Sequence, residues 1–336
     1  MASISTPHDD TQVISLQKRE SELHADSLLQ IMVRRFFKHR MAVAGLVLLM
    51  LIFVYVTLGP IILRTLGVGI SYDGISNYSE AYGNKTNIMN KFDPPSADHP
   101  FGTDGVGRDV LARTIYGGQV SLLIGITSVF ISITLGTSIG LIAGYFGGWV
   151  DALLMRFVEA LLAIPTLIML LVLSRVLRDS VATTSVNFLG RELSFSVVVI
   201  ILIIGFTSWM GLSRIVRSVV LSLKEQEFVL AARTVGARSG RIILVHILPN
   251  CVAPVVVAAT LGVGVAIIVE TALSFLGFGV VEPTATWGNI ITRARERVDD
   301  LWFLWVFPGA LITLTVLAIN FIGDGLRDAL DPRSLK

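Results

Sequence analysis

Few residues in this chain have the types and spacing that catalysis or metal binding requires. The five histidines lack the spacing of metal ligands, and Cys251 is the single cysteine, so an intrachain disulfide is excluded. None of the six lysines follows a glycine, whereas a phosphate-binding loop needs Gly-Lys followed by Ser or Thr. No paired carboxylates or nucleophile-and-base set stands out either. The sequence therefore predicts a protein that is not an enzyme and binds no metal or cofactor itself.

Glu270 is the ionisable residue that most needs an explanation, because apolar residues 263–269 precede it and 271–273 follow it. An ionised carboxylate at mid-bilayer costs about 3 kcal/mol, so this side chain is expected to face protein or water. One interpretation is a pathway or gate residue near the outer end of a span. The alternative is an interhelical hydrogen bond to a partner subunit. Arg156 and Glu159, three residues apart on one helical face, are expected to form a structural pair.

The elements that must position these residues are membrane-spanning helices. The 336 residues are 53% hydrophobic and only 15% charged, whereas a soluble domain carries about 25% charge. Uncharged runs long enough to cross a bilayer recur, and they lack the alternation of barrel strands. We predict an all-α polytopic membrane protein with six spans, at residues 41–63, 114–150, 160–174, 193–213, 242–269 and 301–323.

Two of these spans carry residues that should shape them. The second is long for one helix, and glycines at 117–118 and 147–148 are expected to trim both of its ends. The third is short, and Pro165 within it implies a kink.

The segments outside the spans follow from composition and charge. Residues 1–25 are expected to be disordered, and the polar start is too long and acidic for a cleaved signal peptide, so span one is a retained anchor. Residues 26–40 predict an amphipathic helix on the cytoplasmic face, or simply a basic cluster that sets topology. Residues 64–117 predict an external loop with a short amphipathic helix at 106–116. Residues 118–324 form the core, and 325–336 a tail.

Lysines and arginines before span one, between spans four and five, and after span six predict that both termini are cytoplasmic. The net charge of +2 is too small to argue for a nucleic-acid partner.

Residues 223–249, between spans four and five, form the most informative segment. Phe228, Ala231, Ala232 and Val235 follow the i, i+3, i+4, i+7 pattern of a short helix with one apolar face. Glu225 and Glu227 fall in its first turn, where the helix dipole favours acids. Gly236 stands where a C-terminal cap belongs, and a second helix can begin at Ser239.

This helix–turn–helix exposes small residues, Ala231, Ala232 and Gly236, that would let another backbone approach closely. It is expected to be a docking site on the cytoplasmic face. The alternative from the pattern alone is an interfacial linker that binds nothing.

The 223–249 segment resembles the loop of ATP-binding-cassette importer permeases, which has the form E-A-A, three residues, G, nine residues, I-x-L-P. Ala231-Ala232, Gly236 and Leu248-Pro249 match this pattern, whereas Leu230 replaces the Glu and His246 stands at the Ile position. Any contact assigned to that glutamate is therefore in doubt here. Further segments resemble the C-type permeases of dipeptide and oligopeptide importers, at residues 99–110, 270–277, 287–289 and 323–332.

The resemblance implies a subunit of the bacterial inner membrane that pairs with a second, B-type permease to form a pathway for peptides. Two ATPase subunits would bind ATP and Mg, and an external binding protein would deliver the peptide. The residues implied in coupling to the ATPases are Glu225, Glu227, Phe228, Ala231, Ala232, Arg233, Gly236, Ala237 and Arg238. Related importers carry nickel complexes or glutathione, and these alternatives stay open. An ion-coupled secondary transporter is another, although a single mid-span acid and no internal repeat argue against it.

Overall fold

The computed structural model describes residues 28–65, 84–179, 185–188, 191–295 and 299–330. The segment predicted to be disordered, 1–25, lies outside these residues, as do 66–83 of the predicted external loop and 331–336 of the tail.

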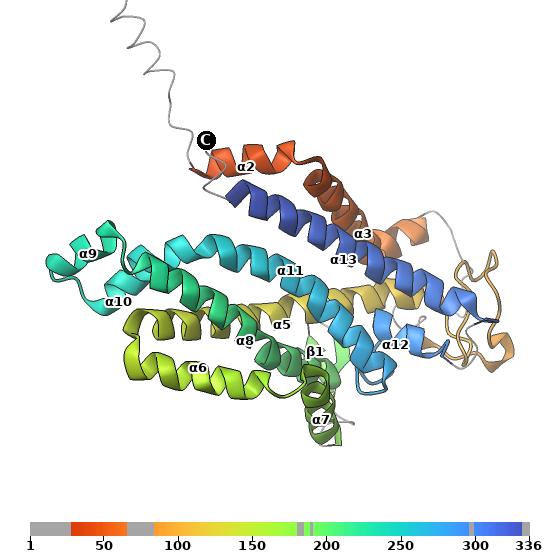
Figure 1. The fold of residues 1–336 in the computed structure, drawn as a ribbon. Helices are drawn as coiled ribbons and strands as arrows, with labels where there is room; N and C mark the ends of the chain where they lie inside the picture. The colour runs from red at the N-terminus through yellow and green to blue at the C-terminus, as the bar shows by residue number, and fades with distance from the viewer. Residues whose placement is uncertain (1–27, 66–83, 180–184, 189–190, 296–298, 331–336) are drawn as a thin grey trace, which may run out of the picture.

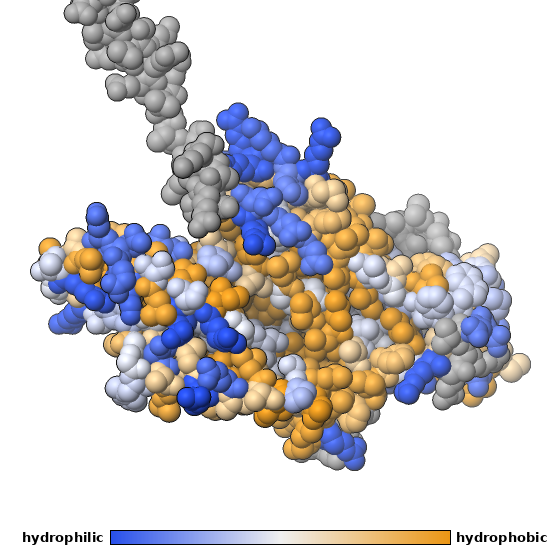
Figure 2. Space-filling model, in the orientation of Figure 1, coloured by the Kyte–Doolittle hydropathy of each residue, from blue (hydrophilic) through white to orange (hydrophobic). Residues whose placement is uncertain are grey.

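The described chain is a bundle of long apolar helices, as the sequence predicts (Figure 1). Five are long and apolar enough to cross a membrane: α3 (Arg40–Thr65), α5 (Val110–Phe146), α8 (Ser196–Leu223), α11 (Leu248–Phe275) and α13 (Trp302–Leu330). The pair α6 (Gly148–Leu162) and α7 (Thr166–Asp179) meets at 83° and is the sixth candidate. The break lies at Pro165, so the predicted kink is confirmed. Hydrophobic surface covers the middle of the bundle, and hydrophilic residues gather toward the ends (Figure 2).

The boundaries of two spans differ from the prediction. The prediction of a separate outer helix at 106–116 is wrong, because α5 begins at Val110 and continues without a break to Phe146. Gly117 and Gly118 do not trim this helix; they lie inside it, where a Cβ on Gly118 would be 2.6 Å from the Trp287 ring. Close packing therefore explains these two glycines, whereas Gly147 does end the helix as predicted. Similarly, α8 extends past the predicted end at residue 213 to Leu223, because charges near a membrane surface do not stop a helix.

Helices α5 and α8 pack along a line of small residues. Gly136, Gly140 and Gly144 recur every fourth residue, so they share one face of α5. A Cβ on Gly136 would lie 2.8 Å from the carbonyl oxygen of Trp209, and one on Gly140 would lie 2.6 Å from that of Ser213. Backbones come this close only where side chains are absent, which is typical of helix pairs in membranes.

Shorter elements lie at the two ends of the bundle. At one end are α9 (Glu227–Thr234), α10 (Ser239–Arg241) and the π-helical turn η2 (Ile242–Ile247), which leads into α11. At the other are the 3-10 turn η1 (Ile88–Asn90) and α12 (Trp287–Thr292). Figure 1 shows α9 and α12 at opposite ends of the molecule.

Two further elements lie beside the spans. The helix predicted at 26–40 is present as α2 (Leu28–Lys38), which packs against α13. A two-stranded antiparallel hairpin, β1 (Ser185–Phe188) and β2 (Arg191–Ser194), pairs Ser185 with Ser194 and precedes α8. The hairpin was not predicted.

Candidate functional site

The 223–249 segment forms the helix–turn–helix that the sequence predicts, except that α9 begins at Glu227, so Glu225 lies before its first turn and not in it. Helix α9 ends in a double cap: the Gly236 N–H donates to the Arg233 carbonyl at 2.9 Å, and the Ala237 N–H donates to the Ala232 carbonyl at 3.0 Å. This arrangement requires a residue with positive φ, and Gly236 has φ +77°. The next helix begins at Ser239, as predicted.

One part of the prediction for α9 is wrong, namely that Ala232 is exposed to a partner. Val229 and Ala232 are buried against α8, η2 and α11, so Ala232 is not available to a partner. Phe228 and Val235 are 41% and 83% exposed instead, because the predicted apolar stripe is turned partly outward. Of the residues implied in coupling, the exposed ones are Glu225, Glu227, Phe228, Ala231, Arg233, Gly236 and Arg238, and Ala237 is half-buried.

A groove runs between α9 and the following turn. It has a volume of about 710 Å³ and extends from Phe228 to His246, with Gly236 and Arg241 on its wall. The lining combines apolar side chains, small residues and cationic side chains. Such a surface suits a helix or loop of another protein that carries apolar and acidic side chains.

Glu270 lies late in α11 and is completely buried. Its Oε1 accepts a hydrogen bond of 2.7 Å from the Ser274 hydroxyl, one turn further along the same helix. The hydroxyls of Ser121 and Thr286 lie beside the carboxyl, yet Oε2 has no well-directed hydrogen bond among the described residues. The side chain thus faces protein, as expected, and its neighbours come from α5 and from the turn before α12.

Helix α12 packs between α5 and α11, and its Trp287 side chain is fully buried. The indole Nε1–H donates to the Thr114 carbonyl at 2.8 Å, and the Trp287 backbone N–H donates to the Ser121 hydroxyl at 3.2 Å. The helix starts at a capping box formed by Thr286 and Asn289. In the sequence, the Trp-Gly-Asn triplet at 287–289 marks this element. The sequence alone does not show that the tryptophan is buried.

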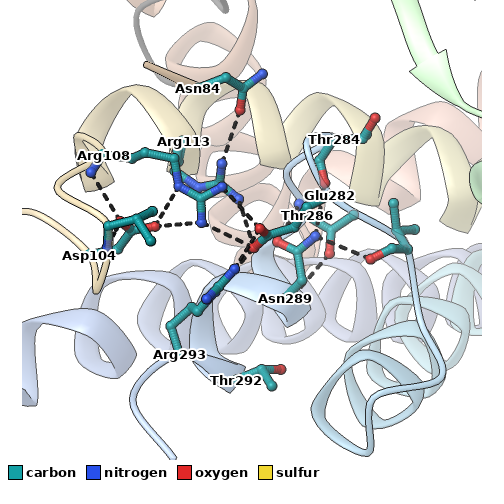
Figure 3. Close-up of polar contacts among 12 residues, drawn as sticks. Asn84, Asp104, Arg108, Arg113, Glu282, Thr284, Thr286, Asn289, Thr292 and Arg293 are labelled. Carbon is teal, nitrogen blue, oxygen red and sulfur yellow. Dashed lines mark hydrogen bonds and ion pairs between the residues drawn. The ribbon is translucent and has the colours of Figure 1, made fainter. Parts of the chain in front are cut away.

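A network of charged groups joins the loop before α5 to the loop before α12 (Figure 3). Arg108 donates to Asp104 within its own loop, from Nε at 2.7 Å, and to both oxygens of Glu282 at 3.1 and 3.0 Å. Arg293 reaches the same carboxylate, with Nη2 2.5 Å from Glu282 Oε2. Arg113, almost fully buried, donates to the Asn84 side-chain oxygen at 3.0 Å. Sequence reasoning missed this network, because it joins residues 174 positions apart.

The network changes the proton affinity of its members. Burial alone would raise the pKa of Glu282, but hydrogen bonds from Arg108 and Arg293 outweigh it and hold the pKa at about 2. Likewise, burial opposes the charge on Arg108, and its two carboxylate partners raise its pKa. Glu282 and Arg108 are therefore both ionised throughout the neutral range.

The start of α5 is fixed by Asp109. Its Oδ1 accepts the N–H of Ala112 at 2.8 Å, which caps the helix, and its Oδ2 lies 2.9 Å from Nδ1 of His99. This hydrogen bond raises the pKa of His99.

Two other predicted groups can be placed. Arg156 and Glu159 pair at 3.5 Å on the exposed face of α6, as expected for a structural contact. Among the described residues, no three His, Cys, Asp or Glu side chains gather as a metal site would need.

Comparison with known proteins gives two family matches and several close relatives. Residues 136–336 match the binding-protein-dependent transport system inner membrane component family, and residues 27–95 match the N-terminal TM domain of oligopeptide transport permease C. The oligopeptide transport system permease protein OppC of Haemophilus influenzae is 38% identical over 325 residues, covering 97% of this chain and 95% of its own. The dipeptide transport system permease protein DppC of Alkalihalophilus pseudofirmus is 38% identical over 296 residues, with 88% and 87% covered.

Proposed function

Because the chain belongs to the binding-protein-dependent transport system inner membrane component family, we propose that it forms half of the membrane pathway of an ATP-binding-cassette importer of di- or oligopeptides. The observation that carries this proposal is its likeness, over nearly its whole length, to permeases named for oligopeptide and dipeptide transport. The chain is an integral membrane permease component and is not itself catalytic.

The finer assignments in this proposal are supported by the family resemblance of the 223–249 motif and by the exposed groove beside it. A second permease of B type completes the pathway, an external binding protein supplies the peptide, and two partner ATPases hydrolyse ATP with Mg. The 223–249 segment is cytoplasmic and docks on an ATPase through the groove beside Gly236. With α9 at the cytoplasmic end, α12 and the Arg108–Glu282 network belong to the outer end.

Transport then requires that ATPase closure be passed through this segment to the spans. ATP binding favours one of two arrangements of the ATPase pair, and the docked segment follows it. Helices α8 and α11 begin or end at the segment, so both move with it.

Glu270 is assigned a role at the outer gate that does not involve contact with the peptide. Its carboxyl is buried beside Ser121 of α5 and close to Gly288 of α12, so it acts by holding α12 against α5 and α11.

The proposal is tested by purifying the protein through a tag on this chain and reconstituting the co-purified subunits in liposomes. Uptake of a labelled dipeptide or oligopeptide should need ATP and the binding protein, and a protonophore should not affect it. Uptake driven by a proton gradient without an ATPase subunit would instead support a secondary transporter. A nickel complex or glutathione found in the binding protein would replace peptide as the cargo.

A further inference from the structure

The turn between α5 and α6 lies beside the 223–249 segment, although some 75 residues separate them in sequence. Gly147 and Gly148 both have positive φ, +65° and +53°, and reverse the chain direction between the two helices. A Cβ on Gly147 would lie 3.8 Å from Nζ of Lys224, the residue that ends α8. The turn is therefore adjacent to the point where α8 passes into the segment.

An ion pair fixes the start of α6 to α8. Arg217, near the end of α8, donates from Nε and Nη2 to the two carboxylate oxygens of Asp151, each at 2.5 Å. The side chains are 32% and 16% exposed, so solvent screens this pair less than a surface pair. A bidentate arginine–carboxylate contact also sets the relative orientation of its two partners.

A second contact joins α9 itself to the end of α5. The Arg233 guanidinium lies over the Tyr145 ring, 5.4 Å from its centroid. Tyr145 also packs against the apolar cluster that holds Val220 of α8 and Val229 of α9. The α5–α6 turn is thus contacted on both sides: α9 of the segment contacts Tyr145 before the turn, and α8, which leads into the segment, contacts Asp151 after it.

Helix α6 has few other attachments. Val158 is its single fully buried residue, while Leu153 and Phe157 are 61% and 56% exposed. At its far end α6 meets α7 across the 83° break. Beyond its first turn, α6 meets α8 through Val158, which packs with Trp209 and Met210, and α7 also packs against α8. The Asp151–Arg217 pair is therefore the polar contact that sets how the first turn of α6 follows α8.

We infer that Asp151 and Arg217 are positioning residues, through which movement of the 223–249 segment reaches the bent span α6–α7. Without this pair, α6 would follow α8 only through the apolar contacts of Val158 and of α7. The inference rests on the proposed function, since ATPase closure is taken as the source of the movement.

The test compares peptide uptake with ATP hydrolysis in the reconstituted importer. Asp151→Asn should lower the number of peptides taken up per ATP about tenfold, within the range typical of coupling between two sites, while hydrolysis persists. The double variant Asp151→Arg with Arg217→Asp restores both charges in exchanged places and should recover most of the loss. Arg156→Gln breaks the exposed Arg156–Glu159 pair of the same helix without removing a charge beside Arg217, and it should leave the ratio unchanged.

Movement itself can be followed by spin labels at exposed sites. Val176 on α7 and Leu244 on η2 are 63% and 62% exposed, Leu244 lies outside the groove, and Leu314 on α13 gives a reference position. Nucleotide should change the distances from Leu314 to both sites in the wild type. In Asp151→Asn the change at Leu244 should remain and that at Val176 should shrink.

The outcomes separate the two proposals. An equal response at Val176 with and without Asp151, or no recovery in the exchanged pair, would overturn this inference. A wild-type complex in which nucleotide moves neither site would instead contradict the proposed function.

Discussion

Arg108 and Glu282 form a two-pronged ion pair across 174 residues of sequence, with nitrogen–oxygen distances of 3.1 and 3.0 Å. This pair is the main polar connection between the loop that precedes α5 and the loop that precedes α12. It holds together two loops that flank the buried Trp287 and Glu270.

Removing the arginine should cost more than removing the glutamate. Arg108→Ala leaves the buried Asp104 carboxylate without its cation, and we expect a loss of about 3 kcal/mol or more of unfolding free energy. Glu282 is about one-third exposed, so Glu282→Gln should cost only about 1 kcal/mol. Thermal unfolding in detergent at neutral pH would compare them, and equal losses would contradict this ranking.

The Glu282 contribution should disappear in acid. Its pKa is about 2 in the folded protein against an ordinary value of 4.5, so the folded state favours the ionised form. The stabilisation is fully present above pH 4.5 and is lost as the pH falls from 4.5 toward 2. We therefore expect the difference in melting temperature between wild type and Glu282→Gln to shrink over this window. A difference that stays constant would show that ionisation is not its cause.

The His99–Asp109 contact should have the opposite pH dependence. The pKa of His99 is raised from 6.5, so its contribution is fully present below pH 6.5 and is lost as the pH rises through the raised value. His99→Gln should consequently destabilise the protein more at pH 6 than at pH 9. The matched measurement on Glu282→Gln should show no such alkaline change, because that carboxylate is ionised throughout.

Substitutions at Gly236 should separate backbone strain from docking. Gly236→Asn tolerates the positive φ and should retain much of the uptake, whereas Gly236→Val should abolish uptake and ATPase association while membrane insertion persists. Gly240 has equally open space around it but ordinary φ, so Gly240→Ala is the control. Normal ATPase association in Gly236→Val would count against the docking assignment.

Glu270 can be tested by an isosteric change. Glu270→Gln keeps an acceptor for Ser274, and uptake should stay close to wild type if the carboxyl only supports α12. Glu270→Ala removes that acceptor and opens a cavity, so uptake should fall and the outer loops should become easier to cleave by added protease. Complete loss of uptake in Glu270→Gln would show that the charge itself is required.

The long helices and α9 could be predicted because their signals are local. Long apolar runs predict the spans. Residues 228–236 show both the helical spacing of apolar residues and the glycine that caps the helix. The ends of the spans were harder, because counting between charges stops at Arg214, whereas α8 continues to Leu223.

The polar contacts depended on the fold and could not be predicted. Nothing near Asp151 in sequence indicates Arg217, and nothing near Arg108 indicates Glu282. Similarly, Gly117 and Gly118 fit the pattern of helix-ending residues, and only the fold places Thr286 against the first and Trp287 against the second.

The uninterrupted length of α5 has a geometric consequence. Its 37 residues extend about 55 Å, nearly twice the ~30 Å hydrocarbon layer. Asp109 anchors one tip beside the outer charges, and Tyr145 lies at the other tip beneath Arg233. A rod of that length tilted by roughly 10° displaces its tips by about 10 Å relative to each other. In the proposed orientation, a tilt of this single helix would link the end where the ATPases dock to the outer end of the protein.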